Sequence, residues 1–97
     1  MAFEIYFSPV FSKSFDKYLI QKQELVVKSI EALKEYLKTS HAPYGLRIKR
    51  LHTGGGSKIY EARVSIDIRI VWVQQGNEIV FSLLGNHEEV RRFLKSF

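Results

Sequence analysis

Residues 58–89 read KIYEARVSIDIRIVWVQQGNEIVFSLLGNHEE, and the fold depends on this stretch. Apolar and polar residues alternate over 60–65, and 68–73 is an almost unbroken β-branched and aromatic run; both patterns are typical of strands. Gln75-Gly76-Asn77 supplies a flexible hairpin turn before a third apolar run over 78–84. We therefore predict three consecutive antiparallel strands that lead into a closing helix.

Three charged residues sit inside these strands. Arg69 interrupts an apolar run, which is costly unless its side chain faces solvent and meets an anion. A turn centred near Ile66 would place Arg63 opposite Arg69, and cross-strand partners point to the same face of a sheet. Glu61 would lie on that face too and could neutralise one arginine. The pattern fits either a surface Glu–Arg–Arg cluster or a phosphate-binding platform.

The N-terminal half predicts a strand followed by two helices. Residues 3–7 alternate as a short strand, and Ser8 and Pro9 suit the N-cap and first position of a helix over about 9–21. After a break near 21–23, an apolar stripe from Val26 to Leu37 indicates a second helix. We expect an α+β fold, in which this two-helix hairpin packs on a twisted antiparallel sheet of about four strands.

The remaining segments complete this arrangement. Residues 39–45 form a connector, 46–51 an extended segment or edge strand, and the glycine-rich 53–57 a hairpin loop rather than a phosphate loop. Asn86 and Glu89 suit an N-cap and N3 pair that opens a short C-terminal helix.

Composition predicts one domain, 1–97, because 97 residues suffice for a single modest core. No run of eighteen apolar residues is present, so no membrane span is expected. The absence of cysteine excludes disulfides and thiolate metal sites. The first residues lack the basic start of a signal peptide, and a cytoplasmic protein fits.

Positive charge is concentrated around the first two predicted strands. The chain carries a net charge of +5, and residues 47–69 hold six basic against two acidic residues. Such a concentration suggests a polyanion as partner, most simply nucleic acid, although an acidic protein would satisfy the same electrostatics.

The order of these pieces resembles the RelE/ParE toxin superfamily of type II toxin–antitoxin systems. The residues that carry the resemblance are Leu51-His52-Thr53-Gly54, Ile59-Tyr60-Glu61-Ala62-Arg63-Val64, Arg69-Ile70-Val71-Trp72 and Gly85-Asn86-His87-Glu88-Glu89-Val90. The resemblance covers nearly the whole chain and implies a RelE-like, microbial RNase-type fold with a concave basic face. It also implies a cognate antitoxin, bound in a toxin–antitoxin hetero-oligomer, with mRNA and the ribosome as further partners.

In the RelE-like branch, the implied activity is metal-independent mRNA cleavage by attack of a ribose 2′-OH on the adjacent phosphate, with no cofactor. That reaction needs proton transfer and cations for the developing negative charge. By resemblance, His87 would transfer a proton, Arg69 and Arg63 would bind phosphate, and Glu61 would act as a base or orient a neighbour. Lys49, Arg50, His52 and Lys58 would contact RNA or the ribosome.

The chain also departs from the RelE pattern. Glu61 stands where RelE has a lysine, and the C-terminal segment offers Phe93 and Phe97 in place of a tyrosine. Two alternatives therefore stay open: a ParE-like toxin that inhibits DNA gyrase without being a nuclease, and an inactive member that only binds antitoxin. ParE-like members generally lack the histidine, so His87 favours the nuclease.

Overall fold

The structure is a computed structural model that describes residues 3–41, 44–54 and 57–96, with only the backbone described at 44 and 52–54. The elements follow in the order β1 (Glu4–Phe7), α1 (Pro9–Lys17), α2 (Ile20–Thr39), the 3₁₀ turn η1 (Tyr44–Leu46), β2 (Lys49–Gly54), β3 (Ser57–Arg63), β4 (Arg69–Gln75), β5 (Glu78–Gly85) and α3 (His87–Leu94). The predicted α+β class is confirmed. No helix in these ranges is both long and apolar enough to cross a membrane.

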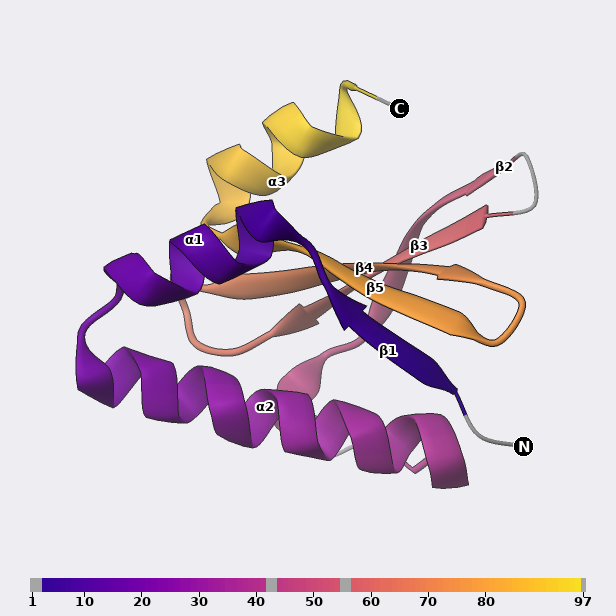
Figure 1. The fold of residues 1–97 in the computed structure, drawn as a ribbon, viewed down its shortest axis with the longest axis horizontal. Helices are drawn as coiled ribbons and strands as arrows, with labels where there is room; N and C mark the ends of the chain where they lie inside the picture. The colour runs from indigo at the N-terminus through magenta and orange to yellow at the C-terminus, as the bar shows by residue number, and fades with distance from the viewer. Residues whose placement is uncertain (1–2, 42–43, 55–56, 97) are drawn as a thin grey trace.

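The strands form one mixed sheet rather than an antiparallel sheet of about four strands. Its five strands lie in the order β1-β5-β4-β3-β2, with β1 parallel to β5 and every other pair antiparallel. The helices carry the chain from β1 to the far edge at β2, and the β2–β5 meander then returns to β1 (Figure 1).

The helix hairpin differs from the prediction at its corner. Ser8 caps α1 as expected, its hydroxyl accepting a hydrogen bond of 3.1 Å from the Phe11 amide. The helix ends at Lys17, however, because Tyr18 and Leu19 have extended backbones, with ψ of 148° and 157°. The second helix consequently starts at Ile20, earlier than the predicted break at 21–23.

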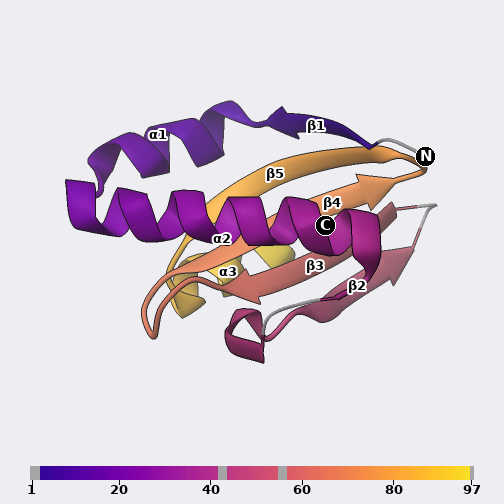
Figure 2. The ribbon, with the colours of Figure 1, turned by 90° about the horizontal axis from the view of Figure 1, so that it is seen from below.

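Helices cover both faces of the sheet, one more fully than the other. The helix α2 crosses one face, and α3 lies on the opposite side (Figures 1 and 2). The main core lies between the α1–α2 hairpin and the sheet and includes Phe11, Trp72 and Phe81, all about 2% exposed or less. A smaller cluster on the α3 side contains Ile59, Val71, Leu83 and Val90. The face that α3 only partly covers is where the charged strand residues lie.

Candidate functional site

The β3–β4 hairpin places two arginines side by side. Arg63 and Arg69 are cross-strand partners, as the sequence predicted. The turn between them is held by the Val64 amide, which donates to the Ile68 carbonyl at 2.9 Å. Lys22 of α2 lies 3.5 Å from the Asp67 carboxylate, which ties this turn to the helix hairpin. The arginine pair is therefore fixed by the backbone at one end of the sheet.

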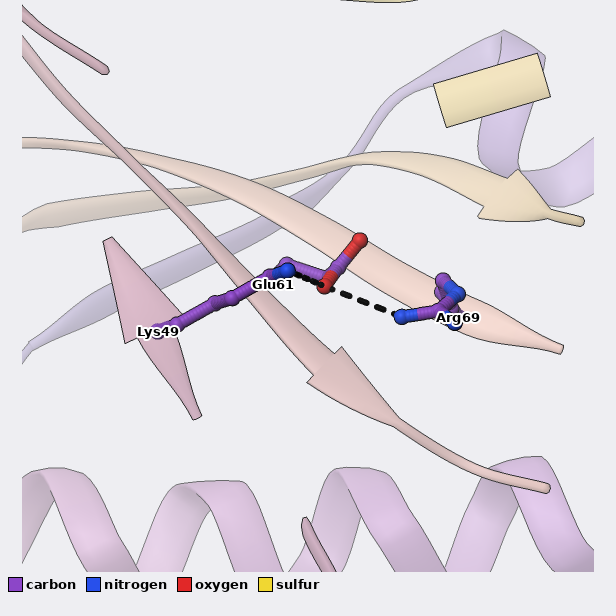
Figure 3. Close-up of polar contacts among 3 residues, drawn as sticks. All are labelled: Lys49, Glu61 and Arg69. Carbon is purple, nitrogen blue, oxygen red and sulfur yellow. Dashed lines mark hydrogen bonds and ion pairs between the residues drawn. The ribbon is translucent and has the colours of Figure 1, made fainter. Parts of the chain in front are cut away.

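Glu61 is the centre of a three-residue charge cluster, which we call the Glu61 cluster: Lys49, Glu61 and Arg69 (Figure 3). Its Oε2 atom accepts a hydrogen bond of 3.2 Å from Nη1 of Arg69 and lies 3.5 Å from Nζ of Lys49. Lys49 is the cross-strand partner of Glu61, so β2, β3 and β4 each contribute one member. The predicted neutralisation of one arginine by Glu61 is confirmed.

The Glu61 cluster is not the surface cluster that the alternation pattern allowed. The Glu61 side chain is only 4% exposed, against 16% for Arg69 and 58% for Lys49. A buried carboxylate is destabilising unless it is paired and hydrogen-bonded. Arg69 supplies most of this compensation, because the exposed ammonium of Lys49 is screened by water. Glu61 and Arg69 thus behave as one largely desolvated unit.

Arg63 differs from Arg69 in having no such counter-ion within the part of the chain that the structure describes. It is partly buried, and no carboxylate among the described residues forms an ion pair with it. Its Nε atom is buried and has no hydrogen-bond partner in the described part of the chain. A buried donor without a partner is destabilising unless a ligand or water satisfies it. Arg63 therefore retains the capacity to bind an anion.

His87 is the first residue of α3 and is exposed. The predicted capping box is present: the Asn86 side chain accepts from the Glu89 amide, and the Glu89 side chain accepts from the Asn86 amide, both at 2.9 Å. Gly85, two residues before His87, is the cross-strand partner of Arg69. The chain thus brings His87 toward the end of the sheet that carries both arginines. No described residue hydrogen-bonds its side chain.

The predicted RNA contacts lie along the β2–β3 hairpin. Lys49, Arg50 and Lys58 are exposed there, while the side chain of His52 lies outside the described part of the chain. The register of β2 against β3 shifts between Arg50 and His52. Sequence reasoning did not identify Lys49 as a partner of Glu61. Its signal would have been the alternation of apolar and basic residues over 46–49, combined with the pairing of Lys49 with Glu61 in the β2–β3 register.

Comparisons with known proteins give the fold. No protein-family model matches the chain, and no curated protein matches it. Among solved structures, the archaeal RelE–RelB complex from Pyrococcus horikoshii superimposes with a TM-score of 0.70 at 14% identity, covering 89% of this chain and 96% of that one. The Escherichia coli DinJ–YafQ toxin–antitoxin complex gives 0.68 at 20% identity, covering 93% and 98%. The YoeB dimer from Staphylococcus aureus gives 0.65 at 24% identity, covering 90% and 99%. The predicted resemblance is confirmed at the level of architecture: this chain has the fold of the RelE, YafQ and YoeB toxins.

Proposed function

We propose that the protein is the toxin of a type II toxin–antitoxin system and cleaves mRNA at the ribosome. The fold supports a toxin of the RelE, YafQ or YoeB kind. The basic residues on β2, β3 and β4 supply the electrostatic attraction that binding to a phosphate backbone requires.

The observation that carries this proposal is the direct pairing of Arg63 with Arg69. Like charges opposite each other destabilise a sheet. Glu61 offsets only Arg69, which leaves the Arg63 guanidinium with a buried Nε and no partner among the described residues. A phosphate bound between the two side chains would relieve their repulsion and satisfy that donor.

The residue roles follow from this arrangement. Arg63 binds a non-bridging oxygen of the phosphate directly and stabilises the negative charge that develops during attack by the 2′-OH. Glu61 holds the Arg69 guanidinium in place, and we assign it this orienting role because its Oε2 atom already accepts a hydrogen bond from Arg69 and its side chain is only 4% exposed. As the 2′-O–P bond forms and the P–O5′ bond breaks, the 2′-hydroxyl loses a proton and the leaving 5′-oxygen gains one. His87, exposed at the start of α3, serves as the base or the acid in this exchange, and water serves as the other partner.

We further propose that an antitoxin neutralises the protein. Two of the structures with the same fold are complexes with a partner, RelE with RelB and YafQ with DinJ, the latter described as a toxin–antitoxin complex. An acidic segment of the antitoxin laid across the basic strands would compete with RNA for the same charges.

Primer extension on mRNA incubated with purified ribosomes tests the nuclease. The wild-type protein should produce discrete cleavage products, and His87→Ala and Arg63→Ala should each reduce cleavage by about a hundredfold or more. His41→Ala and Arg92→Ala are matched controls, because both residues are exposed and lie outside the site. Circular dichroism verifies that each variant is folded.

Cleavage that persists undiminished in both site variants would exclude the assigned roles. Growth arrest without mRNA cleavage, accompanied by gyrase-dependent DNA damage, would favour the ParE-like alternative. Harmless expression with no cleavage on ribosomes would instead identify an inactive antitoxin-binding protein.

A further inference from the structure

Exposed apolar side chains are concentrated at the β1 edge and on the helix hairpin, away from the basic strands. Among the described residues, the large hydrophobic ones with exposed side chains are Tyr6, Phe7, Val10, Leu19, Ile20, Leu25, Val27 and Ile66. All but Ile66 belong to β1, α1, the α1–α2 corner or the first half of α2. An exposed apolar surface of this kind, rimmed by polar residues, marks an interaction site more often than chance.

Three of these side chains, Phe7, Ile20 and Val27, line a groove between α1 and α2, which we call the hairpin groove. It consists of two adjoining hollows of about 310 and 520 Å³ that share Phe15 and Val27 in their linings. Phe7 and Phe11 line one end, and Ile20 lines the other. The α1–α2 pair is visible in Figure 1 as two helices that lie alongside one another and join at a tight corner. Val27 is 43% exposed and Ile20 67%, so the groove is open to solvent.

The charges that line the hairpin groove have the opposite sign to the protein as a whole. Asp16, Glu24 and Glu31 line it against a single lysine, Lys28. The whole chain, by contrast, carries a net charge of +5. An occupant with basic residues beside its apolar contacts would therefore complement both the apolar side chains and the carboxylates that line the groove.

We infer that the hairpin groove binds an amphipathic helix of another protein, with an apolar stripe flanked by lysine or arginine. A helix suits the site because side chains of both α1 and α2 line it, and an amphipathic helix can place apolar anchors at i, i+3 or i+4, and i+7 in such a groove. A second copy of this chain fits poorly, because symmetric pairing would place two grooves of the same net negative charge against each other. This inference is independent of the nuclease, since the groove shares no residue with the Glu61 cluster, Arg63 or His87.

Fluorescence anisotropy with two labelled helical peptides tests the inference on the full chain. Both peptides carry leucines at i, i+4 and i+7; one has lysines beside them and the other has glutamates. We expect the lysine peptide to bind at least about tenfold more tightly, because like charges across an interface are strongly unfavourable. Glu24→Lys combined with Glu31→Lys should reverse that preference.

Val27→Asp should weaken binding of the lysine peptide at least about tenfold, because it places a charge in the apolar floor. Val10→Asp is the matched control: Val10 is 55% exposed on α1, does not line the groove, and should leave the affinity within about twofold. Urea unfolding of both variants separates lost binding from lost fold.

Three results would overturn the inference. The first is equal affinity for both peptides, or no binding of either. The second is self-association of the wild-type chain in sedimentation that Val27→Asp abolishes, which would make a second copy the occupant. The third is binding to neutral phospholipid vesicles that the same variant abolishes, which would make the groove a lipid contact.

Discussion

The two faces of the sheet differ in what their side chains do: one is mainly apolar and packs against the α1–α2 hairpin, and the other carries the charged residues. On the helix side, Trp72 and Phe81 belong to a cluster that includes twelve buried apolar residues among those the structure describes, and the α1–α2 hairpin covers it. On the α3 side, the corresponding cluster includes four such residues, and the same face carries Glu61, Arg63 and Arg69. The period of two along each strand assigns alternate residues to the two faces.

This contrast indicates that the helix side of the sheet provides most of the stability and that the α3 side carries the charged residues. On a face filled by apolar side chains, removing any contact lowers the free energy of unfolding. A face that carries a buried ion pair gains little stability from it, since desolvation offsets most of the attraction. We therefore expect the buried residues on the helix side to tolerate substitution least and the charged residues on the α3 side to determine whether the protein binds RNA.

Truncating a buried side chain on either face of the sheet should lower the free energy of unfolding by the largest amount. Phe81 is fully buried, with its ring centroid 5.2 Å from that of Phe7 and 5.9 Å from that of Phe11. Phe81→Ala should lower the free energy of unfolding by about 3–5 kcal/mol. Leu83→Ala, on the α3 side, should lower it by about 2–3 kcal/mol, because Leu83 belongs to the smaller cluster. Urea unfolding measures both, and an equal or larger effect at Leu83 would contradict the ranking of the two faces.

Breaking the Glu61 cluster should have an intermediate effect. Glu61→Ala should destabilise the fold by about 1–3 kcal/mol, because the partly buried guanidinium of Arg69 loses its acceptor. Lys49→Ala should change the free energy of unfolding by less than about 1 kcal/mol, since its ammonium is mostly in water. The same denaturation series compares them. If the two substitutions had equal effects, Lys49 rather than Arg69 would be the main partner of Glu61.

Adding a single methyl group at the junction between β5 and α3 should lower the stability of the protein. A Cβ added at Gly85 would lie 2.7 Å from Oε1 and 3.1 Å from Cβ of Glu89, whose carboxylate caps the Asn86 amide. Gly85→Ala should therefore displace the capping box and destabilise the protein by about 1 kcal/mol. Gly45→Ala is the matched control, because an added Cβ there meets nothing within 4 Å. Thermal unfolding followed by circular dichroism compares the two variants.

The smallest expected effect is a pH dependence at the β3–β4 turn. A hydrogen bond from the Ser65 hydroxyl, with help from Lys22, holds the pKa of Asp67 below its ordinary value of 3.8. Because the folded-state pKa is the lower one, this stabilisation is fully present above pH 3.8 and is lost as the pH falls through the folded-state pKa. Urea unfolding midpoints measured from pH 6 to pH 2.5 should be higher for the wild type than for Asp67→Asn at the upper end of this range. The difference between the two midpoints should shrink as the pH falls below 3.8. A constant difference between them would refute the linkage.

Much of the fold was predictable from local patterns. The hairpin from β3 to β4 and its Arg63–Arg69 pairing followed from strand alternation about the turn, because cross-strand partners share a face. The caps at Ser8 and Asn86 followed from side-chain chemistry that needs only neighbouring residues. The roles of His87 and Arg63 in catalysis remain predictions that the proposed cleavage assay addresses.

Non-local features were decided only by the tertiary structure. The parallel pairing of β1 with β5, the burial of Glu61 and its contact with Lys49 each depend on segments that are distant in the sequence. The hairpin groove likewise exists only because the fold brings Phe15 of α1 and Val27 of α2 to line the same hollows. Residue periodicity specifies which side of a strand or helix is apolar, whereas packing of whole elements determines which surfaces meet and how much water remains between them.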